Sequence, residues 1–228
     1  MITDKNKTPK VTLLWLNYNS LSIIDLVLRS IESLLNIKYT NYEVIIIDND
    51  SSDSSFERIK DFVKHKEFSH KSLKVKFVKN KHNLGYTGGN YLGYRHRSKD
   101  SKYVAVINND LIVDPFSLMQ LIEHMETHTG TAAVQGKVLT LGKDVIDNCG
   151  FIFDSLYRVY GRCSGYLSLA CVEKAEVSYV SGCYAVYNVE VIERLGGLFG
   201  PTIPYFGYFE DADLGLRLWR RGYKSVYV

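Results

Sequence analysis

The chain has 228 residues and a mass of 26.0 kDa, which fits a single α/β domain better than two full domains. Hydrophobic residues make up 46% and charged residues 23%, and these proportions exclude disordered, collagen-like and coiled-coil chains. The longest apolar runs, such as residues 11–16, are far shorter than the roughly 18 residues of a membrane-spanning helix. The first ten residues are polar and contain no apolar segment typical of a secretory signal, so we expect a cytoplasmic protein.

The net charge of +3 conceals a local basic excess. Residues 58–102 contain 13 Lys/Arg against 3 Asp/Glu, whereas the rest of the chain is acidic. Such a basic excess can bind nucleic acid, an anionic membrane surface or a phosphorylated substrate, or it can simply form a solvated face. We expect a solvated face, with peripheral association to an anionic membrane as the alternative, and no nucleic-acid partner.

Strand-like and helical segments alternate over the first 140 residues, which predicts βαβ units and a mainly parallel sheet. The predicted strands are residues 11–16, 42–47, 73–78 and 103–107. The predicted helices are residues 22–35, 51–66, 85–97 and 115–128.

After residue 130 the segments become shorter and contain more glycine, which predicts a small antiparallel region over residues 131–140, 145–163 and 177–187. Asn188 is expected to cap a short helix, and residues 210–221 predict a final helix. Because residues 223–228 have the pattern of a strand and domains rarely end within one, we expect the natural chain to continue. The four cysteines, Cys149, Cys163, Cys171 and Cys183, form no C-x-x-C pair, so we expect buried free thiols.

Polar residues follow two of the predicted buried strands. In open α/β sheets, ligands bind beyond the carboxyl ends of the strands, so Asp48 and the segment 108–110 are expected to line one crevice. Asp48 can accept hydrogen bonds from a ribose or a base. Asp110 can coordinate Mg²⁺ or Mn²⁺ together with a diphosphate. The alternatives are a simple Asn/Asp turn at residues 108–110 and helix capping by the acids after Asp48.

Two further segments suggest chemistry. The glycine-rich segment 83–90 opens a predicted helix, where backbone N–H groups can face a pyrophosphate, although turn formation alone also explains it. It matches neither the P-loop nor the nicotinamide-binding pattern. Glu210, Asp211 and Asp213 follow the aromatic segment 205–209. Acids suit a helix N-terminus, but an aromatic setting also makes a carboxylate more basic, so we expect a catalytic role for Asp211.

Six short segments occur in a characteristic order: residues 16–19, 45–53, 83–93, 107–110, 181–183 and 209–217. Together they resemble the family 2 inverting glycosyltransferases of GT-A fold, and within that family the rhamnosyltransferase-like branch. The resemblance covers about residues 10–228. It implies a Rossmann-like α/β fold with a mainly parallel central sheet, helices on both faces and a small antiparallel acceptor-side region. It also implies one domain after a polar tail at residues 1–9, with a donor half at 10–130 and an acceptor half, truncated at its C-terminus, at 131–228.

The resemblance also implies roles for individual residues. The nucleotide-binding residues would be Asn17, Tyr18, Asp48, Asn83 and Asn108. The metal ligand would be Asp110, the catalytic base Asp211, and the acceptor-binding residues Gly182, Glu210 and Asp213. The implied activity is metal-dependent transfer, with inversion, of a hexose from a UDP-, dTDP- or GDP-linked donor to a hydroxyl of a glycan or lipid-linked glycan. The implied cation is Mn²⁺ or Mg²⁺.

The chain departs from the family pattern in two places. Asn108 stands where the family usually has the first Asp of an Asp-x-Asp motif, which removes one carboxylate from the metal site. The histidine metal ligand that the family commonly supplies after the last strand is not reached by Val228. A nucleotide-sugar-binding module with weak or no turnover is therefore an alternative, and a nucleotidyltransferase is a third.

Overall fold

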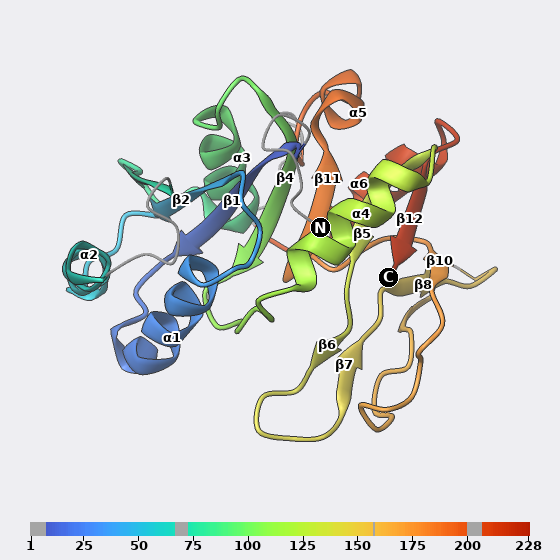
Figure 1. Cartoon of the computed structure of the whole chain (residues 1–228), viewed down its shortest axis with the longest axis horizontal. Helices are drawn as coiled ribbons and strands as arrows, with labels where there is room; N and C mark the ends of the chain where they lie inside the picture. Colours follow the sequence, from blue (N-terminus) through green and yellow to red (C-terminus); the bar gives the residue numbers. More distant parts are fainter. Residues whose placement is uncertain (1–7, 67–72, 157, 200–206) are drawn as a thin grey trace.

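The computed structural model describes residues 8–66, 73–156, 158–199 and 207–228 (Figure 1). Its centre is a sheet of eight strands. In chain order these are β1 (Lys10–Asn17), β2 (Tyr42–Asp48), β3 (Lys74–Lys79), β4 (Ser101–Asn108), β5 (Thr131–Gln135), β10 (Ala175–Val177), β11 (Tyr184–Asn188) and β12 (Lys224–Tyr227). Their spatial order is β10-β12-β5-β11-β4-β1-β2-β3.

The predicted mainly parallel sheet is confirmed. Strand β1 pairs in parallel with β2 and β4, β2 pairs in parallel with β3, and β5 pairs in parallel with β12. Only β11, between β4 and β5, and the edge strand β10 run antiparallel to their neighbours. The parallel connections are made by α1 (Ile24–Leu35), α2 (Ser55–His65) and α3 (Gly85–Arg95). The helix α4 (Ser117–Thr127) then leads from β4 to β5.

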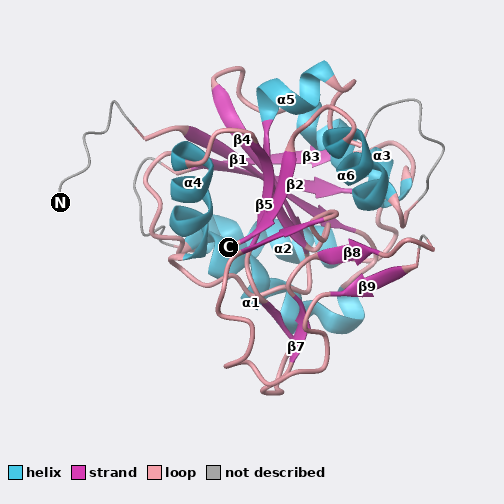
Figure 2. Ribbon diagram, turned by 90° about the vertical axis from the view of Figure 1, so that its right-hand side faces the viewer, coloured by secondary structure: helices cyan, strands magenta, loops and turns pink. Residues whose placement is uncertain are grey.

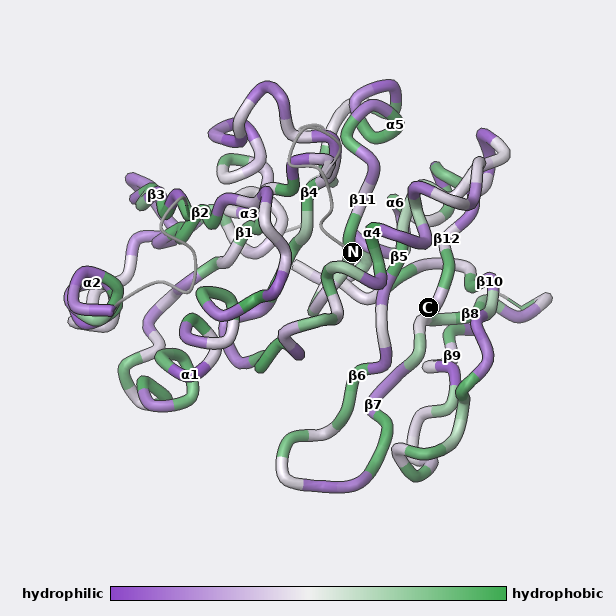
Figure 3. The backbone as a smooth tube through the Cα atoms, in the orientation of Figure 1, coloured by the Kyte–Doolittle hydropathy of each residue, from purple (hydrophilic) through white to green (hydrophobic). Residues whose placement is uncertain are grey.

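The sheet is covered by helices on both faces, as predicted (Figure 2). Successive side chains of a strand point to opposite faces, so Leu13 and Trp15 pack on the side of α1, α2 and α4, whereas Leu14 packs on the other side. That second side is covered by α3, α5 (Val189–Arg194) and α6 (Glu210–Trp219). Figure 3 shows hydrophobic and hydrophilic residues sharing the circumference of α1 and α2, as expected of helices that cover a sheet. Within the described ranges, no helix has the length and apolar character needed to cross a membrane.

The second part of the chain differs from the prediction of a wholly antiparallel region. Strands β5, β11 and β12 extend the central sheet. Their side chains are mostly apolar, and the central sheet buries them on both of its faces. Two small antiparallel sheets do form, one from β6 (Val138–Leu139) and β7 (Ile146–Asn148) and one from β8 (Phe151–Phe153) and β9 (Val159–Gly161). We call residues 136–174 the small lobe.

Helix starts are set by local hydrogen bonds that the periodicity does not reveal. Helix α2 begins at Ser55 rather than residue 51, and the Ser55 N–H is held by Asp53 at 3.0 Å. Helix α4 begins at Ser117, after a turn in which Asp114 accepts from the Phe116 N–H at 2.8 Å. The predicted cap of α5 is confirmed, because Asn188 Oδ1 accepts a hydrogen bond from the Val191 N–H at 3.2 Å.

The prediction that all four cysteines are free thiols is wrong for two of them. Cys163 and Cys171 form a disulfide, whereas Cys149 is buried and free and Cys183 is partly buried and free. The pair lies in loops of the small lobe that leave β9 and approach β10. Their proximity arises from these loops, which have no periodic signal in the sequence.

Candidate active site

The carboxyl ends of β1, β2 and β4 lie side by side at one edge of the sheet. Asn17 is opposite Asp48 in the β1–β2 register, and Leu16 is opposite Asn108 in the β1–β4 register. The parallel register therefore brings Asn17, Asp48 and Asn108 to the same edge of the sheet.

Asn17 and Asp48 are fully buried and hold each other in place. The Asn17 Nδ2 donates to Asp48 Oδ1 at 3.0 Å, and the Ser51 hydroxyl donates to the same oxygen at 2.6 Å. The other carboxylate oxygen accepts from the Ser51 backbone N–H at 3.1 Å. These bonds fix the turn after β2. The neighbouring Tyr18 is 46% exposed, so its ring is accessible at this edge.

Asn83 is also part of an internal network. Its Oδ1 accepts from the Gly85 N–H and from Asn49 Nδ2, each at 2.8 Å. Asn49 in turn accepts from Asn80 Nδ2 at 2.8 Å and from the Leu84 N–H at 3.0 Å. Asn49 thus joins the turn after β2 to the start of α3, a role that the sequence analysis did not assign to it.

The glycines of α3 are explained by close packing against the sheet. A Cβ at Gly89 would lie 2.7 Å from Leu16 Cδ1, and a Cβ at Gly93 would lie 2.3 Å from Ile47 Cδ1. Helix α3 therefore approaches β1 and β2 more closely than a helix with side chains at these positions could.

A cavity of ≈ 470 Å³ lies where the two halves of the chain meet. It is lined by Tyr86, Asn108, Ser181, Gly182, Cys183, Gly207, Tyr208, Glu210 and Asp211. Three of the predicted site residues on the acceptor side and one on the donor side are in this set. Tyr86, Ser181 and Cys183 belong to the six ordered segments, but no pattern in the sequence indicated that they line the site.

Asp211 is the most accessible acid of the cavity. Its Oδ2 accepts from the Gly182 N–H at 3.0 Å and its Oδ1 accepts from the Ala212 N–H at 2.8 Å. The Tyr86 hydroxyl donates to the Gly182 carbonyl at 2.5 Å, so α3 fixes the segment that orients Asp211. Burial raises the pKa of Asp211, and the hydrogen bonds from Gly182 and Ala212 oppose this rise. A partly exposed carboxylate with raised pKa has the properties of a general base.

Glu210 and Asp213 lie in different environments. Glu210 is only 5% exposed, and its Oε2 has no hydrogen-bond partner among the residues that the structure describes. Burial raises the pKa of Glu210 to about 7, and the nearby charge of Asp211 contributes in the same direction. Asp213 instead accepts from Arg217 Nε at 2.7 Å on the helix surface and does not line the cavity. Its acceptor-binding role remains a prediction.

The raised pKa of Glu210 makes stability depend on pH. A folded-state pKa of about 7 against 4.5 in the unfolded chain means that stability present at low pH is lost as pH rises between these values. We expect Glu210→Gln to increase the free energy of unfolding at pH 8 by about 1–2 kcal/mol, after allowing for solvent screening, and to change it little at pH 4. Urea unfolding at both pH values measures this, with the exposed Glu123→Gln as control. An equal effect of Glu210→Gln at pH 4 and pH 8 would contradict the assignment.

Asp110 lies beyond the end of β4 and lines a second cavity of ≈ 540 Å³, together with Tyr184 and Lys137. Its carboxylate is exposed and forms no hydrogen bond or ion pair within the described part of the chain. A free carboxylate is a suitable ligand for a hard divalent cation, and the amide oxygen of Asn108 is a weaker one. Asp110 therefore offers one charged ligand to Mn²⁺ or Mg²⁺, whereas Asn108 lines the other cavity.

The aromatic segment before α6 is described in part. Tyr208 and Phe209 are 85% and 66% exposed and both have left-handed backbone conformations, with φ of 69° and 65°. Tyr208 lines the cavity beside Glu210 and Asp211. Tyr205 and Phe206 lie outside the described residues.

Comparison with known proteins defines the class and the family. The fold of this chain is the GT-A fold of glycosyltransferases: GalNAc-T7, solved with UDP, GalNAc and Mn²⁺, has a TM-score of 0.73 at 14% identity, covering 99% of this chain and 43% of that one. A mannosyltransferase from Pyrobaculum calidifontis, solved with GDP-Man and Mn²⁺, has a TM-score of 0.66 at 16% identity, covering 97% and 55%. The family model of Glycosyl transferase family 2 matches residues 16–196, and the chain belongs to this family.

Sequence relatives are glycosyltransferases too. The chain is 25% identical over 218 residues to a poly-β-1,6-N-acetyl-D-glucosamine synthase of Staphylococcus aureus, covering 95% of this chain and 47% of the synthase. It is 28% identical over 144 residues to an uncharacterized glycosyltransferase of Haemophilus influenzae, covering 63% of this chain and 40% of the relative. The chain thus spans less than half the length of these relatives.

Proposed function

We propose that the chain catalyses single-displacement transfer of a hexose, with inversion, from a nucleotide diphosphate sugar to a hydroxyl of a glycan or lipid-linked glycan. The observation that carries this proposal is the placement of Asp211 in a cavity that also contains Asn108, at the end of β4. One wall of the cavity, at Asn108, is thus at the predicted donor edge, and another wall carries the carboxylate of Asp211. Family membership supports sugar transfer as the reaction.

In this mechanism Asp211 accepts the proton of the acceptor hydroxyl as its oxygen attacks the anomeric carbon. The bond between that carbon and the diphosphate oxygen breaks on the opposite side, which inverts the configuration. Gly182 and Tyr86 hold Asp211 in position through the hydrogen bonds described above. Glu210, protonated below about pH 7, can donate a hydrogen bond to the acceptor.

The donor side is proposed at the carboxyl ends of β1 and β2. The exposed ring of Tyr18 can stack on a base, while Asn17, Asp48 and Asn83 shape the pocket by fixing the turns around it. Structural neighbours bound to GDP-Man or UDP support a nucleotide sugar as the donor. The rhamnosyltransferase-like branch remains part of the proposal, as does a polysaccharide acceptor, which the synthase relatives support.

The activity test separates the enzyme from its alternative. Incubation with radiolabelled UDP-, dTDP- and GDP-sugars and Mn²⁺ should give donor hydrolysis or transfer with at least one donor. Measurable nucleotide binding without any turnover would favour a binding module. Calorimetric titration of UDP, dTDP and GDP identifies the base that the pocket prefers.

Metal dependence should be present and small. A cation held by Asp110 would stabilise the negative charge of the diphosphate, but Asn108 contributes no charge to it. We expect the affinity for nucleotide diphosphate to fall by about tenfold, or 1.4 kcal/mol, when Mn²⁺ is replaced by EDTA. Calorimetry under both conditions measures this, and Asp110→Asn should abolish the difference. Equal affinities in the parent protein would contradict a metal site at Asp110.

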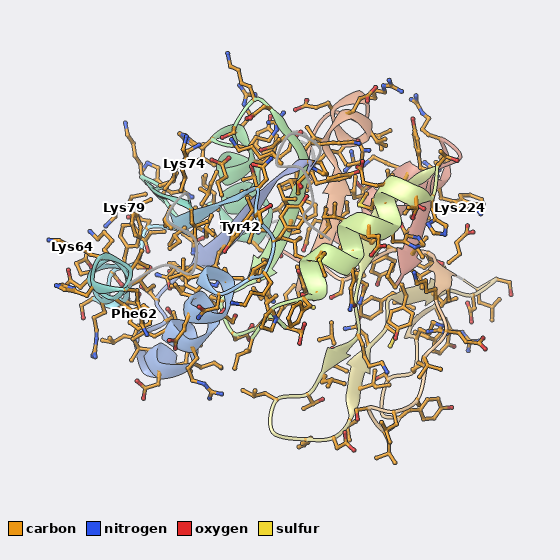
Figure 4. All side chains as sticks on the ribbon, viewed as in Figure 1. Tyr42, Phe62, Lys64, Lys74, Lys79 and Lys224 are labelled. Carbon is orange, nitrogen blue, oxygen red and sulfur yellow. A yellow bond between two sulfur atoms is a disulfide. The ribbon has the colours of Figure 1, made fainter. Side chains whose placement is uncertain are left out.

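The basic surface supports peripheral association with an anionic membrane at its cytoplasmic face. Lys64, Lys74 and Lys79 extend from α2 and β3 on one side of the molecule (Figure 4). Each Lys near a membrane surface contributes about 1 kcal/mol at low salt. Sedimentation with anionic vesicles should exceed that with neutral vesicles, and Lys64→Glu with Lys74→Glu should remove the difference. Equal sedimentation of the parent with both vesicles would contradict the proposal.

A further inference from the structure

Three sulfur atoms gather in the small lobe, on the side of the sheet covered by α5 and α6. The Sγ atoms of Cys149, Cys163 and Cys171 all lie within 4.8 Å of one another. Cys149 is free and fully buried, whereas Cys163 and Cys171 form the disulfide. None of the three belongs to the candidate active site.

The backbone holds these cysteines together independently of the disulfide. The Cys149 N–H donates to the Arg162 carbonyl at 2.9 Å, and the Arg162 N–H donates to the Gly150 carbonyl at 2.8 Å, so Cys149 and Cys163 lie on adjacent segments. The Tyr227 hydroxyl donates to the Cys171 carbonyl at 2.6 Å, which ties the third cysteine to β12. The three sulfurs are therefore expected to remain close after reduction.

We propose that, once the disulfide is reduced, the Sγ atoms of Cys149, Cys163 and Cys171 bind one Zn²⁺ or another thiophilic divalent cation. A tetrahedral zinc with Zn–S bonds of about 2.3 Å requires sulfurs about 3.8 Å apart. The sulfurs of Cys163 and Cys171 would move apart to this distance on reduction, and the sulfur of Cys149 lies within 4.8 Å of both. Thiolates select such cations over Mg²⁺. Three protein ligands leave the fourth position to water.

The surroundings of the sulfurs suit a bound metal. Three thiolates and one Zn²⁺ carry a net charge of −1, and the positive charges of Lys137 and Arg162 act on Cys149. Lys137 also donates to the carbonyls of Ser168 and Ala170 at 2.6 Å each, which fixes the loop before Cys171. One guanidinium nitrogen of Arg162, Nη1, is buried without a hydrogen-bond partner in the described residues. The Tyr227 hydroxyl lies close to Cys149 while it donates to the Cys171 carbonyl, so this side chain is beside two of the three proposed ligands.

Reduction and metal binding require only a phosphine, water and the cation. A water-soluble phosphine reduces the disulfide to two thiols and becomes a phosphine oxide, which takes its oxygen from water. Binding of the cation then releases one proton from each of the three thiols, because a coordinated thiol is deprotonated. The bound metal would clamp the loops of the small lobe to one another and to β12.

The test uses the whole chain, reduced with phosphine under nitrogen and freed of metal. Titration with Co²⁺ should give a sulfur-to-cobalt charge-transfer band that saturates at one equivalent, and Zn²⁺ should displace the Co²⁺ and raise the Tm. Cys183→Ser, which alters a cysteine outside the cluster, should bind in the same way. Cys171→Ser should bind at least about 100-fold more weakly, and Tyr227→Phe about 10- to 100-fold more weakly.

Either of two outcomes would overturn the proposal. One is a reduced parent protein without the charge-transfer band, including the case in which the disulfide resists reduction in the folded chain. The other is tight binding of one equivalent by both Cys149→Ser and Cys171→Ser. Because the parent titration alone decides the first outcome, a variant that fails to fold, as judged by circular dichroism, does not obscure the result.

Discussion

Asp211→Asn is expected to lower the rate of sugar transfer by on the order of 10² to 10⁴. The amide preserves the shape of the side chain and can still accept from the Gly182 N–H, but it cannot take the proton of the acceptor hydroxyl. Donor binding should be unchanged, because the predicted nucleoside site is at the ends of β1 and β2. Single-turnover transfer with a radiolabelled donor, together with calorimetric nucleotide binding, measures both quantities.

The neighbouring acids are the matched controls for this prediction. Glu210→Gln should change the rate less and alter its pH dependence near pH 7, because the pKa of Glu210 lies there. Asp213→Asn should have a small effect on rate, since Asp213 is paired with Arg217 on the helix surface. If Asp211→Asn transfers sugar at a near-normal rate while either control abolishes transfer, the base has been assigned to the wrong carboxylate.

Gly215→Ala should reduce the free energy of unfolding by about 2 kcal/mol. A Cβ at this position would lie 2.3 Å from Tyr179 Cβ and 2.7 Å from the Ser178 carbonyl oxygen, so helix α6 would have to move away from the backbone beside it. Overpacking costs about 1–3 kcal/mol, and contact with a backbone atom places this case at the upper end. The better helix propensity of Ala returns about 1 kcal/mol.

Urea unfolding with an unchanged m-value measures this loss. Gly136→Ala is the matched control, because a Cβ there would have nothing within 4 Å. Since α6 carries Asp211, Gly215→Ala should also lower the transfer rate. A variant as stable as the parent protein would show that α6 does not depend on this close approach.

The elements that could be predicted were those with a strong periodic pattern. The strand ending at Asp48 and the helix lying over Trp15 follow directly from runs of buried residues. The convergence of Asn17, Asp48 and Asn108 at one edge could be predicted too, because parallel strands joined by helices place their carboxyl ends together.

What could not be predicted depends on contacts between distant segments. The hydrogen bond from the Tyr86 hydroxyl to the Gly182 carbonyl joins residues 96 positions apart, and no local sequence pattern predicts it. The sequence suggested that Asp48 faces a ligand, but its carboxylate oxygens accept hydrogen bonds from Asn17 and Ser51. Whether a carboxylate binds internal partners or a ligand depends on the positions of its neighbours, which the sequence alone does not provide. The disulfide likewise depends on the path of two irregular loops.

The placement of β12 has a consequence for how the molecule assembles. Within the described sheet, β10 pairs only with β12, and Glu176 and Lys224 form an ion pair 3.0 Å long across that pairing. The segment between these strands contains Gly182, Glu210 and Asp211, so pairing closes a loop around one wall of the cavity. Such long-range closure is slow, and β10 has no sheet partner until β12 arrives. Because these strands enclose the segment that carries the cavity residues, a ligand that tightens this segment should slow amide hydrogen exchange in β10 and β12.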